Sequence, residues 1–169
     1  MELPHIVAGI LLVSRIGDVG TTYLVTPTLR LEMNPIARRL GWRYALLTLL
    51  VCVIPLYSLE MGVALAMASL LVSASNAAKV WAVRALGEQR HLDLMLEAAR
   101  RSKRSHALVG VAASAIFLMM AGGLVLLFYP AADWGIGFWL GVGIVGYGFA
   151  IWFHGSLWVM RIFKMAKSA

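Results

Sequence analysis

The residues of this chain that could do chemistry lie in stretches that are otherwise apolar. Asp18 and Thr22 stand four residues apart, and Arg15 precedes the aspartate by three, all within one long apolar run. A charge at the centre of a membrane helix costs about 2.5 to 3.5 kcal/mol on insertion scales, so such residues are functional hypotheses by default. A structural interpretation competes, because Arg15 and Asp18 can pair across one helical turn.

Further polar residues are expected near the same depth. They lie after the first apolar run or late in later runs: Glu32, Asn34, Asn76, Lys79 and His154. All except His154 join Arg15, Asp18 and Thr22 in a predicted ligand-binding cluster. Hard cations prefer carboxylate and amide oxygens, and an imidazole extends the choice to zinc, manganese or iron. Asp18, Glu32 and His154 are therefore the candidate ligands of a divalent metal ion.

Two of these residues also have plain structural interpretations. Asn34 directly precedes Pro35, and this pair is typical of the N-cap and first turn of a helix. A single histidine such as His154 is more often a hydrogen-bonded packing residue than a ligand. The cluster is thus predicted as a ligand site, with helix capping and packing as the alternatives.

Composition places the cluster in a membrane protein. The 169 residues are 61% hydrophobic and only 14% charged, with a mean hydropathy of +0.82, whereas an average soluble domain is about 25% charged. A transmembrane helix needs roughly 20 mostly apolar residues. Five segments qualify, at 5–25, 36–57, 61–83, 107–129 and 136–160. The predicted fold is an all-α polytopic membrane helix bundle with five transmembrane helices.

The distribution of charge predicts the orientation of these spans. Lys and Arg collect after spans one, three and five, while the other side holds Glu2, Glu60 and Asp133 and no basic residue. Short cytoplasmic loops carry the excess of Lys and Arg, so the N-terminus is predicted outside and the C-terminus in the cytoplasm. The net charge of +7 is explained in this way, and no nucleic-acid partner is expected. We expect a multi-pass protein of the inner (plasma) membrane.

The chain divides into three predicted parts. Residues 1–84 form a three-helix membrane unit with the polar cluster, 85–106 a cytoplasmic amphipathic basic connector, and 107–169 a two-helix glycine-rich hairpin with a basic tail. The apolar start is expected to be retained, because it begins with an acidic residue and has no small-residue cleavage site. The single cysteine, Cys52, offers no disulfide framework.

The connector is predicted to be an amphipathic helix on the cytoplasmic leaflet. Its apolar residues follow helical spacing: Leu92, Met95, Leu96 and Ala99. Glu97 can pair with Arg101 one turn on. The basic end, RRSKRSH, would lie among anionic lipid headgroups. A solvated connector and a specific lipid- or partner-binding segment both remain open.

Small residues form stripes on the last two predicted spans. They are Gly137, Gly141, Gly148 and Gly155 on the fifth span, and Gly110, Ser114 and Ala121 on the fourth. Such stripes let helix backbones approach closely. We expect the two stripes to pack together, with a homo-oligomer or a membrane partner as the alternative. Tryptophans, among them Trp134, Trp139, Trp152 and Trp158, are expected to anchor the fifth span at the interfaces.

The polar motifs of the first half resemble a known family. D-x-x-x-T (Asp18, Thr22), E-x-N-P (Glu32 to Pro35) and a late Asn76 are similar to the DUF5658-like group of small, functionally uncharacterised bacterial and archaeal membrane proteins. The resemblance covers roughly the first half of the chain and implies a fold of few helices with no established activity. Members often carry a lysine in the second span, where this chain has none. Lys79 or Arg15 is the candidate replacement.

Three functions remain open from the sequence. A small transporter or ion-handling protein would coordinate a cation or protonated solute with Asp18, Glu32 and Asn34, although the outer half shows no matching polar pathway. A non-catalytic subunit or assembly factor would use the small-residue stripes and the cluster. An intramembrane metal-dependent lipid enzyme would need Asp18, Glu32 and His154 together, and with neither H-E-x-x-H nor G-x-S-x-G present it is the least favoured.

Overall fold

A computed structural model of the protein describes residues 2–129 and 135–168, and within these ranges all regular structure is helical. The elements in chain order are α1 (Leu3–Val25), α2 (Pro35–Leu40), α3 (Arg43–Leu49), the 3-10 helix η1 (Leu50–Leu56), α4 (Leu59–Leu86), α5 (Glu88–Arg101), α6 (Arg104–Phe128) and α7 (Ile136–Ser168). The helices α1, α4, α6 and α7 are long and apolar enough to cross a membrane. The prediction of an all-α fold with several apolar spans is confirmed at this level.

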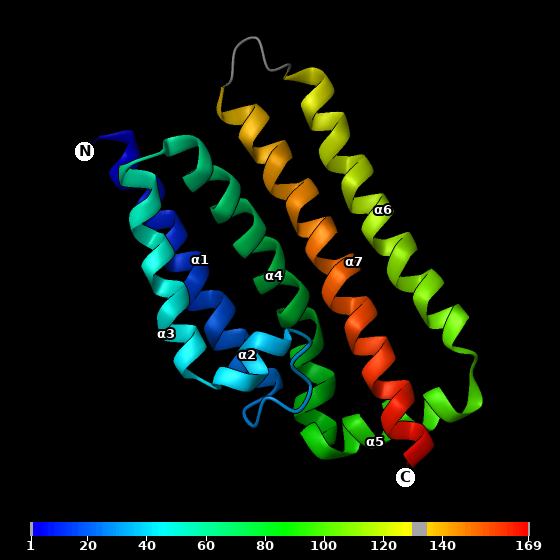
Figure 1. Ribbon diagram of the computed structural model, residues 1–169. Helices are drawn as coiled ribbons and strands as arrows, with labels where there is room; N and C mark the ends of the chain where they lie inside the picture. The colour runs from blue at the N-terminus through cyan, green and yellow to red at the C-terminus, as the bar shows by residue number, and fades with distance from the viewer. Residues whose placement is uncertain (1, 130–134, 169) are drawn as a thin grey trace.

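The long helices lie side by side rather than around a single axis. α6 packs against α7, α7 against α4, and α4 against α1, while η1 contacts both α1 and α4 (Figure 1). The N-terminus lies at one end of this array, and the C-terminus lies at the other end together with α2 and α5 (Figure 1). The predicted polar cluster lies on the α1 and α4 side of the molecule, because these two helices carry five of its residues: Arg15, Asp18, Thr22, Asn76 and Lys79.

The predicted second span, 36–57, is not one continuous helix. α2 begins as expected, because the Asn34 side chain caps it by accepting the backbone N–H groups of Ile36 and Ala37 at 2.9 and 3.4 Å. It ends after six residues at Gly41, whose φ is +63°. L-residues rarely adopt this backbone conformation, and glycine adopts it at little cost, so Gly41 ends the helix.

After this break the chain returns along α1. α3 and η1 together form a shorter apolar helical segment, Arg43–Leu56, which runs from the end that carries α2 toward the end that carries the N-terminus (Figure 1). Pro55 lies within η1. Proline has no backbone N–H to donate, and it is compatible here with a tightened last turn before α4 begins at Leu59.

The glycine stripe of α7 packs against α6, as the sequence predicted. A Cβ on Gly148 would lie 3.0 Å from the Ala115 carbonyl oxygen, and one on Gly141 would lie 3.0 Å from the Gly122 carbonyl oxygen. The predicted face of α6 is wrong, however. Gly110, Ser114 and Ala121 are exposed, and the contacting residues lie one position further along. One residue rotates the face by about 100° on a helix of 3.6 residues per turn, and the spacing of small residues fits both faces.

The connector forms the predicted amphipathic helix, and part of its apolar face is covered by protein. Leu92 and Ala99 of α5 are buried together with Trp158, Ile162 and Ala166 of α7. The end of α7 supplies an apolar surface for this part of the face, while Met95 is 36% exposed. The placement of the helix on the leaflet stays a prediction. The expected ion pair is confirmed, with Arg101 Nη2 2.5 Å from Glu97 Oε1.

The tryptophans of α7 differ in their surroundings. Trp152 is exposed, as an interfacial anchor would be, whereas Trp158 is buried in the cluster with α5. Trp134, Asp133 and the expected end of span four at Pro130 lie outside the described residues.

Candidate functional site

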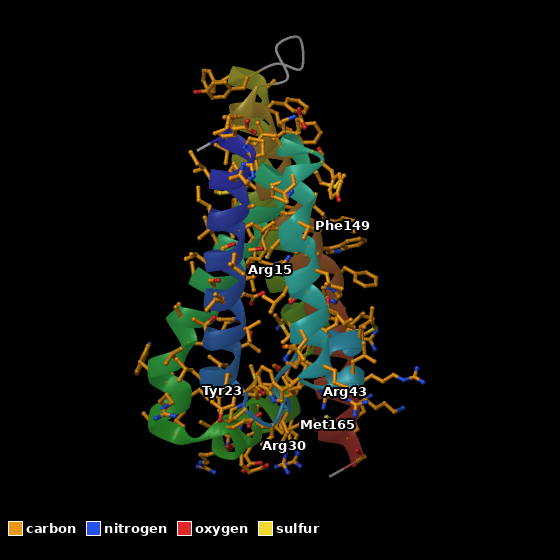
Figure 2. The ribbon with its side chains drawn as sticks, turned by 90° about the vertical axis from the view of Figure 1, so that its left-hand side faces the viewer. Arg15, Tyr23, Arg30, Arg43, Phe149 and Met165 are labelled. Carbon is orange, nitrogen blue, oxygen red and sulfur yellow. The ribbon has the colours of Figure 1, made fainter. Side chains whose placement is uncertain are left out.

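Three polar residues of α1 form the first part of the site. Arg15 Nη1 donates to Asp18 Oδ2 at 3.4 Å, and Thr22 Oγ1 donates to Asp18 Oδ1 at 3.5 Å. The Arg15 and Asp18 side chains are 17% and 19% exposed. The predicted ion pair between Arg15 and Asp18 is confirmed. Its nitrogen-to-oxygen distance is long for an ion pair, and both side chains are partly exposed. Arg15 lies midway along the bundle, whereas Tyr23 and Arg30 lie nearer the end that carries α5 (Figure 2).

Hydrogen bonds extend this part of the site to α4. Asn76 Nδ2 donates to Thr22 Oγ1 at 3.0 Å, so Asp18, Thr22 and Asn76 form one chain across the interface between α1 and α4. One turn further toward the N-terminal end, Ser73 Oγ donates to the Ser14 carbonyl oxygen at 3.1 Å. The close approach is helped by Gly17, since a Cβ there would lie 3.4 Å from Ser73 Oγ.

The connection after α1 supplies the second carboxylate. Glu32 is half-buried, and its Oε1 accepts the Asn34 backbone N–H at 2.7 Å. Burial raises the pKa of the Glu32 carboxyl, against the opposing effects of that N–H, of Arg38, of the Met33 N–H and of Lys79. The charge of Glu32 also acts on the Asp18 carboxyl group. The two carboxylates therefore belong to one electrostatic site.

Asn34 and Lys79 lie at the edge of this site. The Asn34 amide oxygen caps α2, and its Nδ2 donates to the Tyr44 hydroxyl at 3.2 Å. Both ends of the amide are thus engaged in fixing the local fold; the cap was predicted, and the bond to Tyr44 was not. Lys79 is exposed on α4, near enough to Glu32 to stabilise its charge.

His154 does not join the two carboxylates. Its Nδ1 is buried and has no hydrogen-bond partner among the described residues, and its ring packs edge-on against Phe153 with centroids 5.2 Å apart. In the described ranges no group of three or more His, Cys, Asp and Glu side chains is arranged to hold a metal ion. Asp18, Glu32 and His154 are accordingly not gathered into the predicted metal centre.

The sequence analysis missed Tyr147 of α7, which extends the site to a third helix. Tyr147 is buried, and its hydroxyl lies near the Ser75 side chain and within electrostatic range of Asp18. The sequence does contain a signal for this residue, because Tyr147 directly precedes Gly148, which belongs to the glycine stripe that brings α7 close to its neighbours. An aromatic hydroxyl at such a position needs a buried polar partner.

Glu88 of α5 was also missed, and its side chain accepts four hydrogen bonds. Its Oε1 accepts Thr26 Oγ1 at 2.5 Å and the Arg30 N–H at 3.0 Å. Its Oε2 accepts Thr28 Oγ1 at 2.8 Å and the Thr28 N–H at 3.2 Å. Glu88 thereby ties the connection after α1 to the start of α5. No sequence signal could have paired residues about 60 positions apart.

No protein-family model, curated protein or solved structure matches this chain. The site must therefore be interpreted from its own geometry. That geometry is a hydrogen-bonded chain across α1 and α4 that includes the Asp18 carboxylate, with the half-buried Glu32 carboxylate in the connection after α1.

Proposed function

We propose that this chain is a five-span protein of the inner (plasma) membrane, with its N-terminus outside and its C-terminus in the cytoplasm. The span that this proposal adds to the four long helices is the second one along the chain, the α3 and η1 segment, with seven residues in each part. At 1.5 Å per α-helical and 2.0 Å per 3-10 residue it is about 24 Å long, which approaches the hydrocarbon thickness of about 30 Å. The basic ends of α2, α5 and α7 support the orientation.

In this proposal the polar cluster binds a small cation or a protonated solute from the cytoplasmic side, as in a small transporter. The observation that carries it is the presence of two half-buried carboxylates, Asp18 and Glu32, with the Glu32 charge acting on Asp18. Two like charges at close range disfavour each other's ionised form, and a bound cation relieves this repulsion. Thr22 and Asn76 add polar atoms beside the pair.

The test is cation-dependent stability of the protein purified in a mild detergent. Na⁺, K⁺, Mg²⁺, Mn²⁺ and Zn²⁺ are the probes, and elemental analysis by mass spectrometry reports any ion retained. We expect one probe to raise the melting temperature of wild type, since saturation at about 100 times Kd stabilises by about 2.7 kcal/mol. Asp18→Asn and Glu32→Gln should abolish the shift. Asp93→Asn, an exposed carboxyl on α5, is the matched control and should keep it.

An unchanged melting temperature with every probe, or an equal shift in all four proteins, would remove the support for cation binding. The alternative function, a non-catalytic subunit or assembly factor, is favoured by the exposed face of α6 that carries Gly110, Ser114 and Ala121. It predicts that a second membrane protein copurifies in stoichiometric amount. Kinship with the DUF5658-like group is likewise a proposal, supported by the D-x-x-x-T and E-x-N-P residues.

A further inference from the structure

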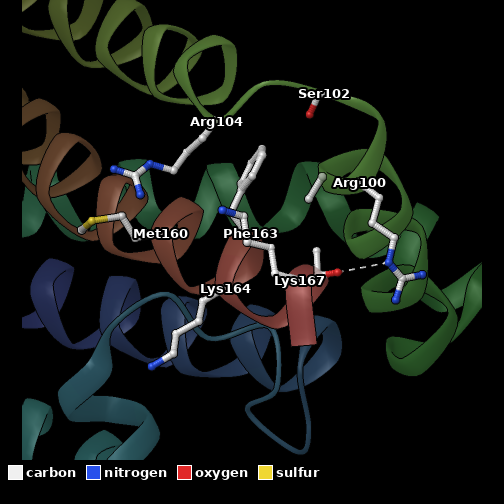
Figure 3. A pocket seen from close by; sticks show the side chains of 9 residues that line it. Arg100, Ser102, Arg104, Met160, Phe163, Lys164 and Lys167 are labelled. Atoms are coloured by element: carbon white, nitrogen blue, oxygen red, sulfur yellow. Dashed lines mark hydrogen bonds between the residues drawn. The ribbon is translucent and has the colours of Figure 1, made fainter. Parts of the chain in front are cut away.

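A groove separate from the polar cluster opens at the end of the molecule that carries the C-terminus. It lies between the end of α5, the start of α6 and the last turns of α7, is open to the surface, and has a volume of about 680 Å³. Figure 3 shows Arg104 of α6 and Lys167 of α7 on the side of the groove where Phe163 lies, while Lys164 of α7, which also lines the groove, extends away from Arg104. None of the described residues that line it is acidic.

The groove has an apolar wall and a cationic rim. Met160, Phe163, Lys164 and Lys167 follow the i, i+3, i+4, i+7 spacing, so they share one face of α7. Met160 is 41% exposed and lies on the side from which the apolar part of α7 continues. Along this face of α7 the surface of the groove changes from apolar to cationic. An anionic phospholipid has the same order of groups, with an apolar acyl chain followed by a charged headgroup.

The cations at the rim are available to an anion. Arg104, Lys164 and Lys167 are exposed, and the two ion pairs of the described residues involve neither them nor any other residue of the groove. Arg100 differs, because its Nε donates to the Ala166 carbonyl oxygen at 3.3 Å and so fixes the end of α7 (Figure 3). The groove also contains the N-terminal end of α6, because Ser102 and Arg104 flank its N-cap residue, Lys103. Lys103 makes no side-chain capping bond. The positive end of the α6 helix dipole therefore adds to the positive electrostatic potential of the groove.

We infer that this groove binds the phosphate-bearing headgroup of an anionic phospholipid, with one acyl chain along Met160 and Phe163. Arg104 and Lys167 are unpaired cations that suit a phosphate diester, and Lys164 adds positive charge near them. A free phosphate would use the same cations and leave the apolar wall without an occupant, so the groove fits a lipid better than a soluble anion. This inference does not depend on the proposed cation site.

The experiment is native mass spectrometry of the full chain released from detergent, titrated with phosphatidylglycerol or phosphatidylcholine. A variant with Arg104→Gln, Lys164→Gln and Lys167→Gln removes the rim charges and leaves Arg100 in place. The matched control carries Arg43→Gln, Arg84→Gln and Arg90→Gln, three exposed arginines outside the groove. We expect wild type and control to retain phosphatidylglycerol over phosphatidylcholine, and the groove variant to bind phosphatidylglycerol at least about tenfold more weakly.

Equal losses in the two triple variants would overturn the inference, because they would show attraction to net charge alone. Equal retention of the two lipids by wild type would also overturn it. So would displacement of phosphatidylglycerol by inorganic phosphate in the millimolar range, which would make free phosphate the better ligand. If the groove variant does not fold, wild type is crosslinked to a photoreactive phosphatidylglycerol. Adducts on the segment 160–167 support the inference, and their absence there refutes it.

Discussion

At the residue scale, Asp18 and Glu88 show two ways of holding a carboxylate in this chain. Asp18 depends on side chains of its own helix, through long hydrogen bonds from Arg15 and Thr22. Glu88 accepts four hydrogen bonds from three residues of a distant connection, the longest being 3.2 Å. The ionised form of Glu88 is therefore firmly held, whereas Asp18 keeps capacity for a further partner.

The Glu88 contacts predict a stability that depends on pH. Burial opposes ionisation of this carboxyl, but the hydrogen bonds from Thr26, Thr28 and Arg30 outweigh it and hold its pKa below the ordinary value. Because the folded state favours the carboxylate, the stabilisation is complete above the ordinary glutamate pKa. It is lost as pH falls through the lower folded-state value.

Glu88→Gln should lower the free energy of unfolding by about 1 to 2 kcal/mol at neutral pH and flatten its decline in acid. Thermal unfolding in detergent across a pH series measures both effects. Glu97→Gln is the control, since its exposed ion pair with Arg101 contributes only about 0.3 to 0.5 kcal/mol. Equal effects of the two substitutions would contradict the role given to Glu88.

Local spacing decided which residue contacts could be predicted. The pairing of Arg15 with Asp18, the cap at Asn34 and the pair of Glu97 with Arg101 all lie within four residues, so helix geometry alone specifies them. The contacts of Glu88 with Thr26 and of Tyr147 with Ser75 join distant segments. They depend on how helices pack, and a single sequence carries no direct signal of that.

At the element scale, the close approach of α6 and α7 depends on particular glycines. A Cβ on Gly148 would lie 2.9 Å from Met119 Cγ and 3.0 Å from the Ala115 carbonyl oxygen, whereas a Cβ on Gly146 would meet nothing within 4 Å. The two glycines lie two residues apart on the same helix. A substitution to alanine at each position therefore distinguishes the effect of packing against α6 from the effect of helix propensity.

Gly148→Ala should therefore destabilise the protein by about 1 to 3 kcal/mol, because the two backbones must move apart. Gly146→Ala should be neutral or stabilise by up to about 1 kcal/mol, since alanine is the better helix former. Melting temperatures of both variants in the same detergent give the comparison. Similar destabilisation by both would show that packing of α7 against α6 does not depend on this stripe.

Element boundaries were predictable where apolar length decided them. The spans at 5–25, 61–83 and 136–160 lie within α1, α4 and α7, because a long apolar run has few alternatives to a helix in lipid. The run at 36–57 has an alternative, since Gly41 permits a positive φ and Pro55 disfavours a regular α-helix. The face of α6 that packs against α7 could not be predicted in the same way. The predicted and the observed faces differ by one residue along the helix, and the spacing of small residues is compatible with both.

At the scale of the whole molecule, the lengths of the apolar helices and the distribution of charge together support the proposed membrane topology. The N-terminus and the start of α4 lie at one end, and α2, α5 and the C-terminus lie at the other (Figure 1). Arg43 and Arg30 also lie at the second end (Figure 2). An excess of Lys and Arg marks the cytoplasmic side of a membrane protein, so the proposed orientation follows from which end is basic.

Cysteine labelling tests this orientation in a Cys52→Ala background, where the single native cysteine is removed. Glu60→Cys and Ser102→Cys replace exposed residues at opposite ends of the array. An impermeant maleimide should label position 60 in intact cells and position 102 only after the membrane is opened. The reverse pattern would invert the orientation. Labelling of both positions from outside would mean that α4, which lies between them, does not cross the membrane, and Asp18 and Asn76 would then lie at a surface rather than within a bilayer.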